Sequence, residues 1–137
     1  MKINTKGNKP SKASAGAAAY DLRATSRISI APFERVLVKT GVTIELPPDC
    51  VGMVCPRSGI ALKNGVTVLN APGIIDPDYR GEIGVILINL GNNFFEIHPG
   101  DRVAQLLICR FEDAEFEDGD LSSTERGEGG FGSTGNG

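Results

Sequence analysis

Three residues that could take part in catalysis, Asp76, Asp78 and Tyr79, lie within four consecutive positions of the chain. Apolar runs at 66–69 and 83–90 flank them, and the residues between the runs are rich in glycine and proline. This pattern predicts a strand, a tight connection and a returning strand. A carboxylate can activate water that lies within hydrogen-bond reach, so we interpret the segment as a reaction centre.

A second candidate site lies at the start of a short helix predicted over 59–63, with Ser58 as its N-cap and Gly65 as its stop. Arg57, Ser58 and Gly59 would place a cation, a hydroxyl and a free backbone N–H there. Together these groups can bind an anion. The alternative is an ordinary serine cap beside an exposed arginine.

Two further polar positions each allow two interpretations. Gln105 follows a turn at 98–101 and is either a ligand-binding amide or a surface amide on a strand. Tyr20 and Asp21 form either a buried hydrogen-bonded pair or part of a site. Residue type alone does not decide between these readings.

The segment 121–137 consists mostly of glycine, serine, threonine and glutamate, a composition typical of a disordered tail. It nevertheless contains Arg126 and Phe131, followed by the hydroxyls of Ser133 and Thr134. A guanidinium, an aromatic ring and hydroxyls among glycines would suit a flexible strap over a phosphorylated aromatic ligand.

Most of the remaining chain predicts short strands. Apolar and polar residues alternate around Ile28–Ile30, Val36–Val38, Val42–Leu46 and Val51–Cys55, which is the period of half-buried strands. The run 83–90 is apolar on both faces and predicts a central, fully covered strand, with a hairpin turn after it at 91–93. A last long strand is expected over 103–111, and a loop leading into a strand over 15–24. Many short strands with glycine and proline turns predict an all-β sandwich, jelly roll or barrel.

Composition narrows the class of protein. A chain of 137 residues suits one domain, and its net charge of −3 does not favour a general nucleic-acid surface. There is no apolar run of the roughly 20 residues that span a bilayer, and the N-terminus lacks the core of a signal peptide. We therefore expect a soluble, intracellular protein without a membrane partner. The three cysteines read as small buried hydrophobes, and the single histidine, His98, lies in a turn.

Five segments, taken together, resemble a known family. AAAYDLRA (17–24), PRSGIALKNG (56–65), GIIDPDYRG (73–81), PGDRVAQL (99–106) and RGEGGFGSTG (126–135) are similar, in this order, to the five motifs of the homotrimeric dUTPases. The resemblance implies a jelly-roll-like (β-clip) subunit with one short helix over 1–120 and a closing C-terminal arm over 121–137. It also implies a three-fold homotrimer whose active sites are shared between chains.

The resemblance implies Mg²⁺-dependent hydrolysis of dUTP to dUMP and pyrophosphate by in-line attack of water on the α-phosphorus. Such an enzyme keeps uracil out of DNA and supplies dUMP for thymidylate synthesis. It would be cytoplasmic, or nuclear in a eukaryote, and would bind nucleotide rather than nucleic acid.

Roles for individual residues also come from the resemblance. Asp76 would be the general base, Tyr79 would exclude a 2′-hydroxyl, and Asp21 would hold a Mg²⁺-bound water. Asp78 becomes a turn residue. Uracil would be read by Asn70, Gly73, Ile74, Ile75 and Gly84, the last across a hairpin. Phosphate contacts would come from Arg57, Ser58, Gly59 and Gln105, and the closing arm would contribute Arg126, Phe131, Gly132, Ser133 and Thr134.

Two alternative functions fit the sequence less well. In the related dCTP deaminases, a glutamate base lies ten residues after the shared Asp-Pro, where this chain has Ile86. A binding or regulatory protein that kept the fold without catalysis would be expected to have lost Asp76, Tyr79 or the arm, and all are present. A regulatory role in addition to catalysis stays open.

Overall fold

The computed structural model describes all residues, 1–137, and contains eleven strands and one helix. The predicted all-β class with one short helix is therefore confirmed. The helix is α1 (Ser58–Asn64). The strands are β1 (Asn4–Gly7), β2 (Tyr20–Arg23), β3 (Ile28–Ile30), β4 (Arg35–Lys39), β5 (Val42–Glu45), β6 (Cys50–Cys55), β7 (Val66–Val68), β8 (Gly73–Ile75), β9 (Gly84–Asn89), β10 (Phe95–Ile97) and β11 (Arg102–Arg110).

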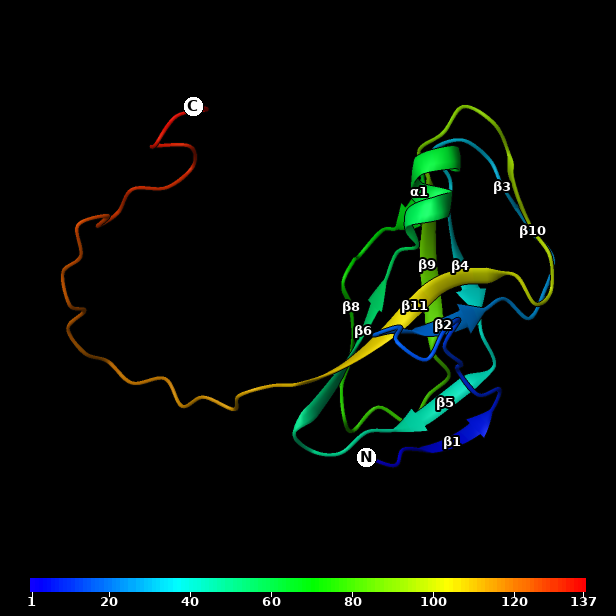
Figure 1. Ribbon diagram of the computed structural model, residues 1–137, viewed down its shortest axis with the longest axis horizontal. Helices are drawn as coiled ribbons and strands as arrows, with labels where there is room; N and C mark the ends of the chain where they lie inside the picture. Colours follow the sequence, from blue (N-terminus) through cyan, green and yellow to red (C-terminus); the bar gives the residue numbers. More distant parts are fainter.

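The strands form four antiparallel sheets around one core (Figure 1). The largest has the order β2-β11-β6-β8, a second has the order β4-β9-β7, and β1-β5 and β10-β3 are two-stranded. One cluster of 18 buried apolar residues holds the sheets together. Alternation explains this packing, since β5 buries Val42 and Ile44 and turns Glu45 outward.

The buried face of β6 is the opposite of the one that its apolar side chains suggested. Cys50, Gly52 and Val54 are buried, whereas the predicted series Val51, Met53 and Cys55 is only half-buried. Both faces of this strand carry apolar residues, so the pattern could not decide which one turns inward. The interior is tight at Gly52, where a Cβ would lie 3.1 Å from the Ile75 Cβ.

The strand predicted over 83–90 is central, as expected, because β9 lies between β4 and β7. Its two faces are not equally covered. Val85 and Leu87 are fully buried, but Ile86 and Ile88 on the other face are only half-buried. The strand is therefore central as predicted, but this single chain covers only one of its two faces fully.

The predicted strand at 66–69 and its returning strand at 83–90 do pair, as β7 and β9. The connection between them is not a tight turn, because it contains β8, which crosses to the other sheet and pairs with β6. The hairpin expected after β9 does not form. The turn after β9 leads to β10, which pairs with β3 rather than with β9. Turn residues reverse the chain, but the burial of apolar faces between the sheets decides which strands pair.

The helix begins one residue earlier than predicted. Ser58 is its first residue, and Arg57 takes the N-cap position without a side-chain capping hydrogen bond. Gly65 ends the helix as expected, in the left-handed conformation at φ 68°, and its N–H donates to carbonyls of the last turn. α1 is the single helix, and no helix here has the length and apolar character needed to cross a membrane.

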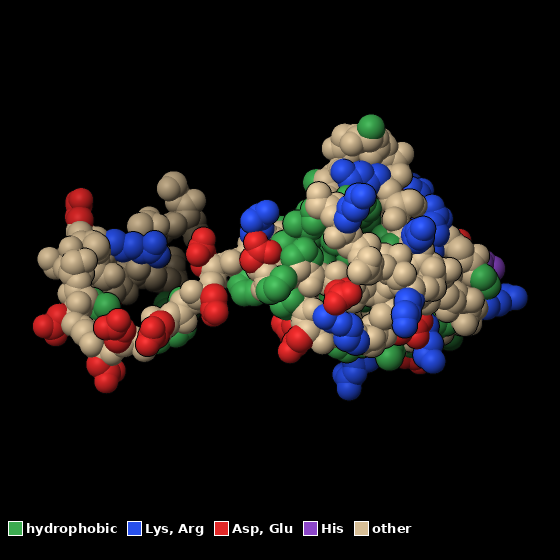
Figure 2. All heavy atoms as spheres, turned by 90° about the horizontal axis from the view of Figure 1, so that it is seen from below, with side chains coloured by type: hydrophobic (Ala, Val, Ile, Leu, Met, Phe, Trp, Pro, Cys, Tyr) green, Lys and Arg blue, Asp and Glu red, His purple; other side chains and the backbone are tan.

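After β11 the chain leaves the body of the protein. Residues 111–137 contain no strand or helix, and Figure 1 shows them extending away from the sheets. Phe116, Leu121 and Phe131 in this segment are almost completely exposed. Figure 2 shows the same separation and acidic side chains along the segment.

Candidate active site

Asp76 lies in an exposed turn that directly follows strand β8 at the surface of the body. Asp76 directly follows Ile75, and its carbonyl accepts a hydrogen bond from the Tyr79 N–H at 3.1 Å, which closes the turn. The Asp76 carboxylate is exposed and borders a groove of about 590 Å³ that Glu45 also lines. The predicted base is thus accessible to water and held by a fixed backbone.

Tyr79 is fixed at its far end as well. Its hydroxyl donates to the Glu82 carbonyl at 2.9 Å, and the Glu82 carboxylate accepts the Gly41 N–H at 2.6 Å. Gly81 lies against the ring, because a Cβ there would lie 2.5 Å from the Tyr79 Cζ. Tyr79 is still 44% exposed, which leaves its ring accessible to a ligand.

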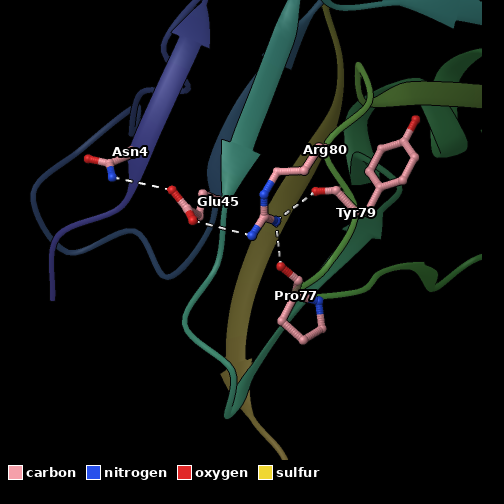
Figure 3. A network of polar contacts seen from close by, with 5 residues as sticks. All are labelled: Asn4, Glu45, Pro77, Tyr79 and Arg80. Atoms are coloured by element: carbon pink, nitrogen blue, oxygen red, sulfur yellow. Dashed lines mark hydrogen bonds and ion pairs between the residues drawn. The ribbon is translucent and has the colours of Figure 1, made fainter.

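Arg80 joins the turn to the neighbouring strand β5 (Figure 3). Its guanidinium donates to the carbonyls of Pro77 at 2.6 Å and Tyr79 at 3.2 Å, and it pairs with Glu45 at 3.3 Å. Asn4 on β1 donates to the other Glu45 oxygen at 3.4 Å. In Figure 3 the Tyr79 ring points away from this network.

The residues predicted to read uracil are divided between two sheets. Gly73 is buried, and a Cβ there would lie 3.3 Å from both the Asn70 Nδ2 and the Val54 Cβ, so backbone and amide lie close together. Ile74 lies opposite Met53 in the register of β8 and β6 and is 55% exposed. Gly84 lies in β9 opposite Lys39, and the expected hairpin between β8 and β9 is absent.

The predicted phosphate contacts gather at the end of the large sheet. Gln105 lies opposite both Asp21 and Cys55 and donates to the Pro56 carbonyl at 2.9 Å. Arg57 donates to the Arg102 carbonyl at 3.1 Å. The structure thus brings Asp21, Arg57 and Gln105 together, although they come from three separate motifs. Ser58 and Gly59 are exposed at the start of α1 beside them.

Arg102 belongs to this second group, and sequence reasoning missed it. Its guanidinium lies 3.7 Å from the Asp21 carboxylate, of which only 12% is exposed. Two charged residues 81 positions apart become neighbours because β11 and β2 pair, with a register shift between Arg102 and Ala104. Only knowledge of the strand pairing could have revealed this contact.

The two groups lie at opposite ends of the β6–β8 pair. Asp76 follows Ile75, which is opposite Gly52, whereas Arg57 lies beyond Cys55 at the other end of β6. Gly52 and Arg57 are five positions apart on the same strand and its extension, which at a rise of about 3.3 Å per residue is about 17 Å along the strand direction. No hydrogen bond or ion pair links the two groups within the chain.

The arm residues contact neither group. Arg126 donates to the Gly129 carbonyl at 2.8 Å, and the Ser133 N–H donates to the Gly130 carbonyl at 3.1 Å, so the bonds are local. Phe131 has a positive φ of 52° and a fully exposed ring. Gly132 and Thr134 lie in the same exposed turns.

The side chains offer limited means of holding a metal directly. No group of three or more His, Cys, Asp or Glu side chains is arranged to bind an ion. Asp21 is a single, mostly buried carboxylate next to the residues predicted to contact phosphate. That chemistry fits a hydrogen bond to a metal-bound water, because Mg²⁺ keeps several of its waters in protein sites.

Comparison with known proteins assigns the class. The dUTPase family model matches residues 5–135. The chain is 54% identical to the deoxyuridine 5'-triphosphate nucleotidohydrolase of Methylocella silvestris, covering 92% of this chain and 82% of that protein. It is 48% identical to the protein of the same name from Clostridium novyi, covering 98% and 95%. The chain therefore belongs to the dUTPase family.

Solved structures support the same fold. The dUTPase of Staphylococcus bacteriophage 80alpha with dUPNHPP superposes with a TM-score of 0.86 at 26% identity, covering 98% of this chain and 99% of that one. A mutant dUTPase from phage phi11 of S. aureus, described with a structural Mg(II) ion, gives a TM-score of 0.82 over 88% and 98%. At 20% identity, the second comparison bears on the fold alone.

Proposed function

We propose that this protein hydrolyses dUTP to dUMP and pyrophosphate and that Asp76 is its general base. Membership of the dUTPase family supports the reaction, and the position of Asp76 is the single observation that supports the role. Its carboxylate is exposed at the end of β8, in a turn closed by the Tyr79 N–H. From there it would orient and deprotonate a water for in-line attack on the α-phosphorus, with the bond to the β-phosphate oxygen breaking.

Recognition of the nucleoside would come from the same turn and from the backbone before it. Tyr79, held through its hydroxyl, would lie under the deoxyribose and leave no room for a 2′-hydroxyl. Uracil would pair with backbone groups, and a cytosine would leave polar groups unpaired at a cost of about 1–3 kcal/mol each. The residues that we assign to uracil are Asn70, Gly73, Ile74, Ile75 and Gly84.

The triphosphate would bind at the end of the large sheet. Arg57 and Gln105 are already positioned there by hydrogen bonds to backbone carbonyls, and the exposed Ser58 and Gly59 lie beside them. Asp21 would accept a hydrogen bond from a water of Mg²⁺. When bound to the triphosphate, Mg²⁺ would neutralise part of the phosphate charge.

The arm would close over the bound nucleotide. Phe131 would stack on uracil, Arg126 would pair with phosphate, and Ser133 and Thr134 would donate to the γ-phosphate, with Gly132 allowing close approach. Closure excludes water, which strengthens every charged contact inside the site.

We propose that three chains form the functional unit. The support is the separation of Asp76 from Arg57 along β6 and β8, together with half-exposed apolar faces on two sheets. Residues from neighbouring chains would complete each site and cover Ile86 and Ile88. Light scattering should report three chains, and a monomer at active concentrations would contradict the shared site.

In the cell, this reaction would keep uracil out of DNA and supply dUMP for thymidylate synthesis. The bacterial relatives are consistent with a cytoplasmic enzyme. The chemistry itself is what the first experiment should establish.

That experiment measures pyrophosphate release from dUTP, dTTP, dCTP and UTP in parallel. We expect turnover of dUTP alone at low enzyme concentration. Asp76→Asn should keep nucleotide binding but lower kcat by on the order of 100-fold or more, because the amide cannot accept the proton of the water. Near-normal turnover by this variant would remove Asp76 from the mechanism. Ammonia release from dCTP would instead indicate a deaminase.

A further inference from the structure

The turn that carries Asp76 and Tyr79 has little support from burial. Both side chains are exposed, and Pro77 is the one half-buried residue between them. Catalysis nevertheless requires these groups to be held within a fraction of an ångström of the reacting atoms. Some other contact has to fix the turn relative to the sheets.

Arg80 supplies that contact, and we propose that it is a positioning residue for the reaction. Its guanidinium binds two carbonyls of the turn, those of Pro77 and Tyr79, and the Glu45 carboxylate on β5. This inference rests on the proposed roles of Asp76 and Tyr79, whose side chains Arg80 does not contact by a hydrogen bond or ion pair. Figure 3 shows the guanidinium between the turn and β5, on the side away from the Tyr79 ring.

The acceptor that Arg80 binds outside the turn is itself fixed. Glu45 is the last residue of β5, opposite Asn4 in the register with β1, and Asn4 donates to its second oxygen. The turn is thereby tied to two strands of the body. Its other end is tied separately, through the Glu82 carboxylate and the Gly41 N–H.

Arginine is the residue type suited to this task. Its planar guanidinium presents five N–H donors in a fixed arrangement, so one side chain can bind the two carbonyls and the carboxylate together. A lysine ammonium has three donors on one atom and cannot reproduce the spacing of both nitrogens. The pair with Glu45 is exposed on both sides, so it contributes little to the stability of the fold.

Because Arg80 holds the turn but adds little stability to the fold, its loss should affect the reaction much more than the melting temperature. Arg80→Gln should lower kcat for dUTP by about 10-fold to 100-fold, the effect of a displacement of about 1 Å. Its melting temperature should fall by no more than about 4 °C. Preference for dUTP over UTP should also fall, because Tyr79 is the neighbour whose carbonyl Arg80 holds.

Three further variants define the contact. Arg80→Lys should recover part of the lost kcat, and Glu45→Gln should have a smaller effect than Arg80→Gln because the turn carbonyls stay bound. The double variant should be no worse than Arg80→Gln alone, as expected for two residues acting through one contact. Arg110→Gln is the matched control, because Arg110 forms a similar exposed pair with Asp49 at 2.9 Å, and its kcat should not change.

Wild-type protein and Asp76→Asn are measured in the same assay, so the two proposals can fail separately. If wild type turns over, Asp76→Asn is inactive and Arg80→Gln keeps normal kcat and preference for dUTP, the role of Arg80 is refuted alone. The role of Arg80 would also be refuted if Arg80→Gln lost kcat equally for dUTP and UTP and its melting temperature fell by a large amount. If wild type does not hydrolyse dUTP, the proposed function fails and the role of Arg80 fails with it.

Discussion

The turn over 76–82 and the arm over 126–135 both carry proposed active-site residues, but the structure holds them in opposite ways. The turn is linked to the body through Arg80 and Glu82, and it is followed by Ile83, which is fully buried and donates its N–H to the Val42 carbonyl at 2.7 Å. The arm forms only local bonds. If the proposed roles are right, the turn is already ordered before substrate binds, whereas the arm would become ordered only through contacts outside itself.

Composition explains the difference. The turn lies between half-buried Ile75 and fully buried Ile83, so burial of these side chains in the sheets offsets the entropy lost when the turn is ordered. The arm contains five glycines between 126 and 135 and a single large apolar residue, Phe131. Glycine loses more backbone entropy on ordering than any other residue, and this segment has no buried surface to offset the loss. In the proposed mechanism, substrate contacts and a neighbouring chain would supply the stabilisation of the closed arm.

The largest effect is expected from deleting the arm, which tests whether catalysis requires it. Deletion of residues 126–137 should abolish measurable dUTP turnover, because Arg126 and Phe131 are lost and water enters the site. The body should keep its melting temperature and its number of chains in light scattering, since no contact between arm and sheets is lost.

The matched control is a chain that ends at Gly135 and so keeps every proposed contact residue. It should be active. A fully active protein lacking 126–137 would show that the prepared turn and the phosphate residues suffice, and the proposed closure would be wrong.

A smaller effect is expected from changing the shape of the turn alone. Gly81→Ala introduces a Cβ that would lie 2.5 Å from the Tyr79 Cζ and 2.9 Å from its Cε2, so the ring has to move. Gly81 has no positive φ, so alanine adds no backbone strain there. We expect kcat/KM for dUTP to fall by about 10-fold to 100-fold, with a weaker preference over UTP.

Gly119→Ala is the control for this variant, because a Cβ at Gly119 has no neighbour within 4 Å. Steady-state kinetics with dUTP and UTP measure both variants. Unchanged selectivity in Gly81→Ala would show that the position of the Tyr79 ring does not decide sugar recognition.

The comparison also shows what a sequence can predict. Alternation located β3, β4 and β5, and the long apolar run located β11, because half-buried strands leave a clear period of two. It did not determine the inward face of β6, where both faces are apolar, or the partner of β8. Those choices depend on how the sheets pack together, which no local pattern contains.

The candidate site also contains residues that local sequence patterns could identify and residues that they could not. Asp76, Tyr79 and Arg126 were proposed from motifs that are continuous in the sequence. Arg80 and Arg102 gained a role only from long-range contacts, with Glu45 and Asp21 respectively. The separation of Asp76 from Arg57 likewise follows from strand register and not from motif order.

The smallest expected effect concerns the body that supports the turn. Burial, with the neighbouring Asp49 carboxylate, raises the pKa of the Cys50 thiol, which is fully buried, whereas Cys55 and Cys109 are partly exposed. Native protein should therefore react with iodoacetamide at Cys55 and Cys109 before Cys50, because the thiolate is the nucleophile. Peptide mass spectrometry identifies the modified residue.

The sign of the pH dependence follows from the same shift. Because the pKa of Cys50 is raised in the folded state, the folded protein holds the thiol proton more tightly than the unfolded chain does. The resulting contribution to the free energy of unfolding is fully present below the unfolded thiol pKa of about 8.5 and is lost as the pH rises through the folded value. The protein lacking 126–137 should protect Cys50 as well as the full chain does. Faster alkylation of Cys50 after the deletion would mean that the arm stabilises the body, and the two regions would then not be independent.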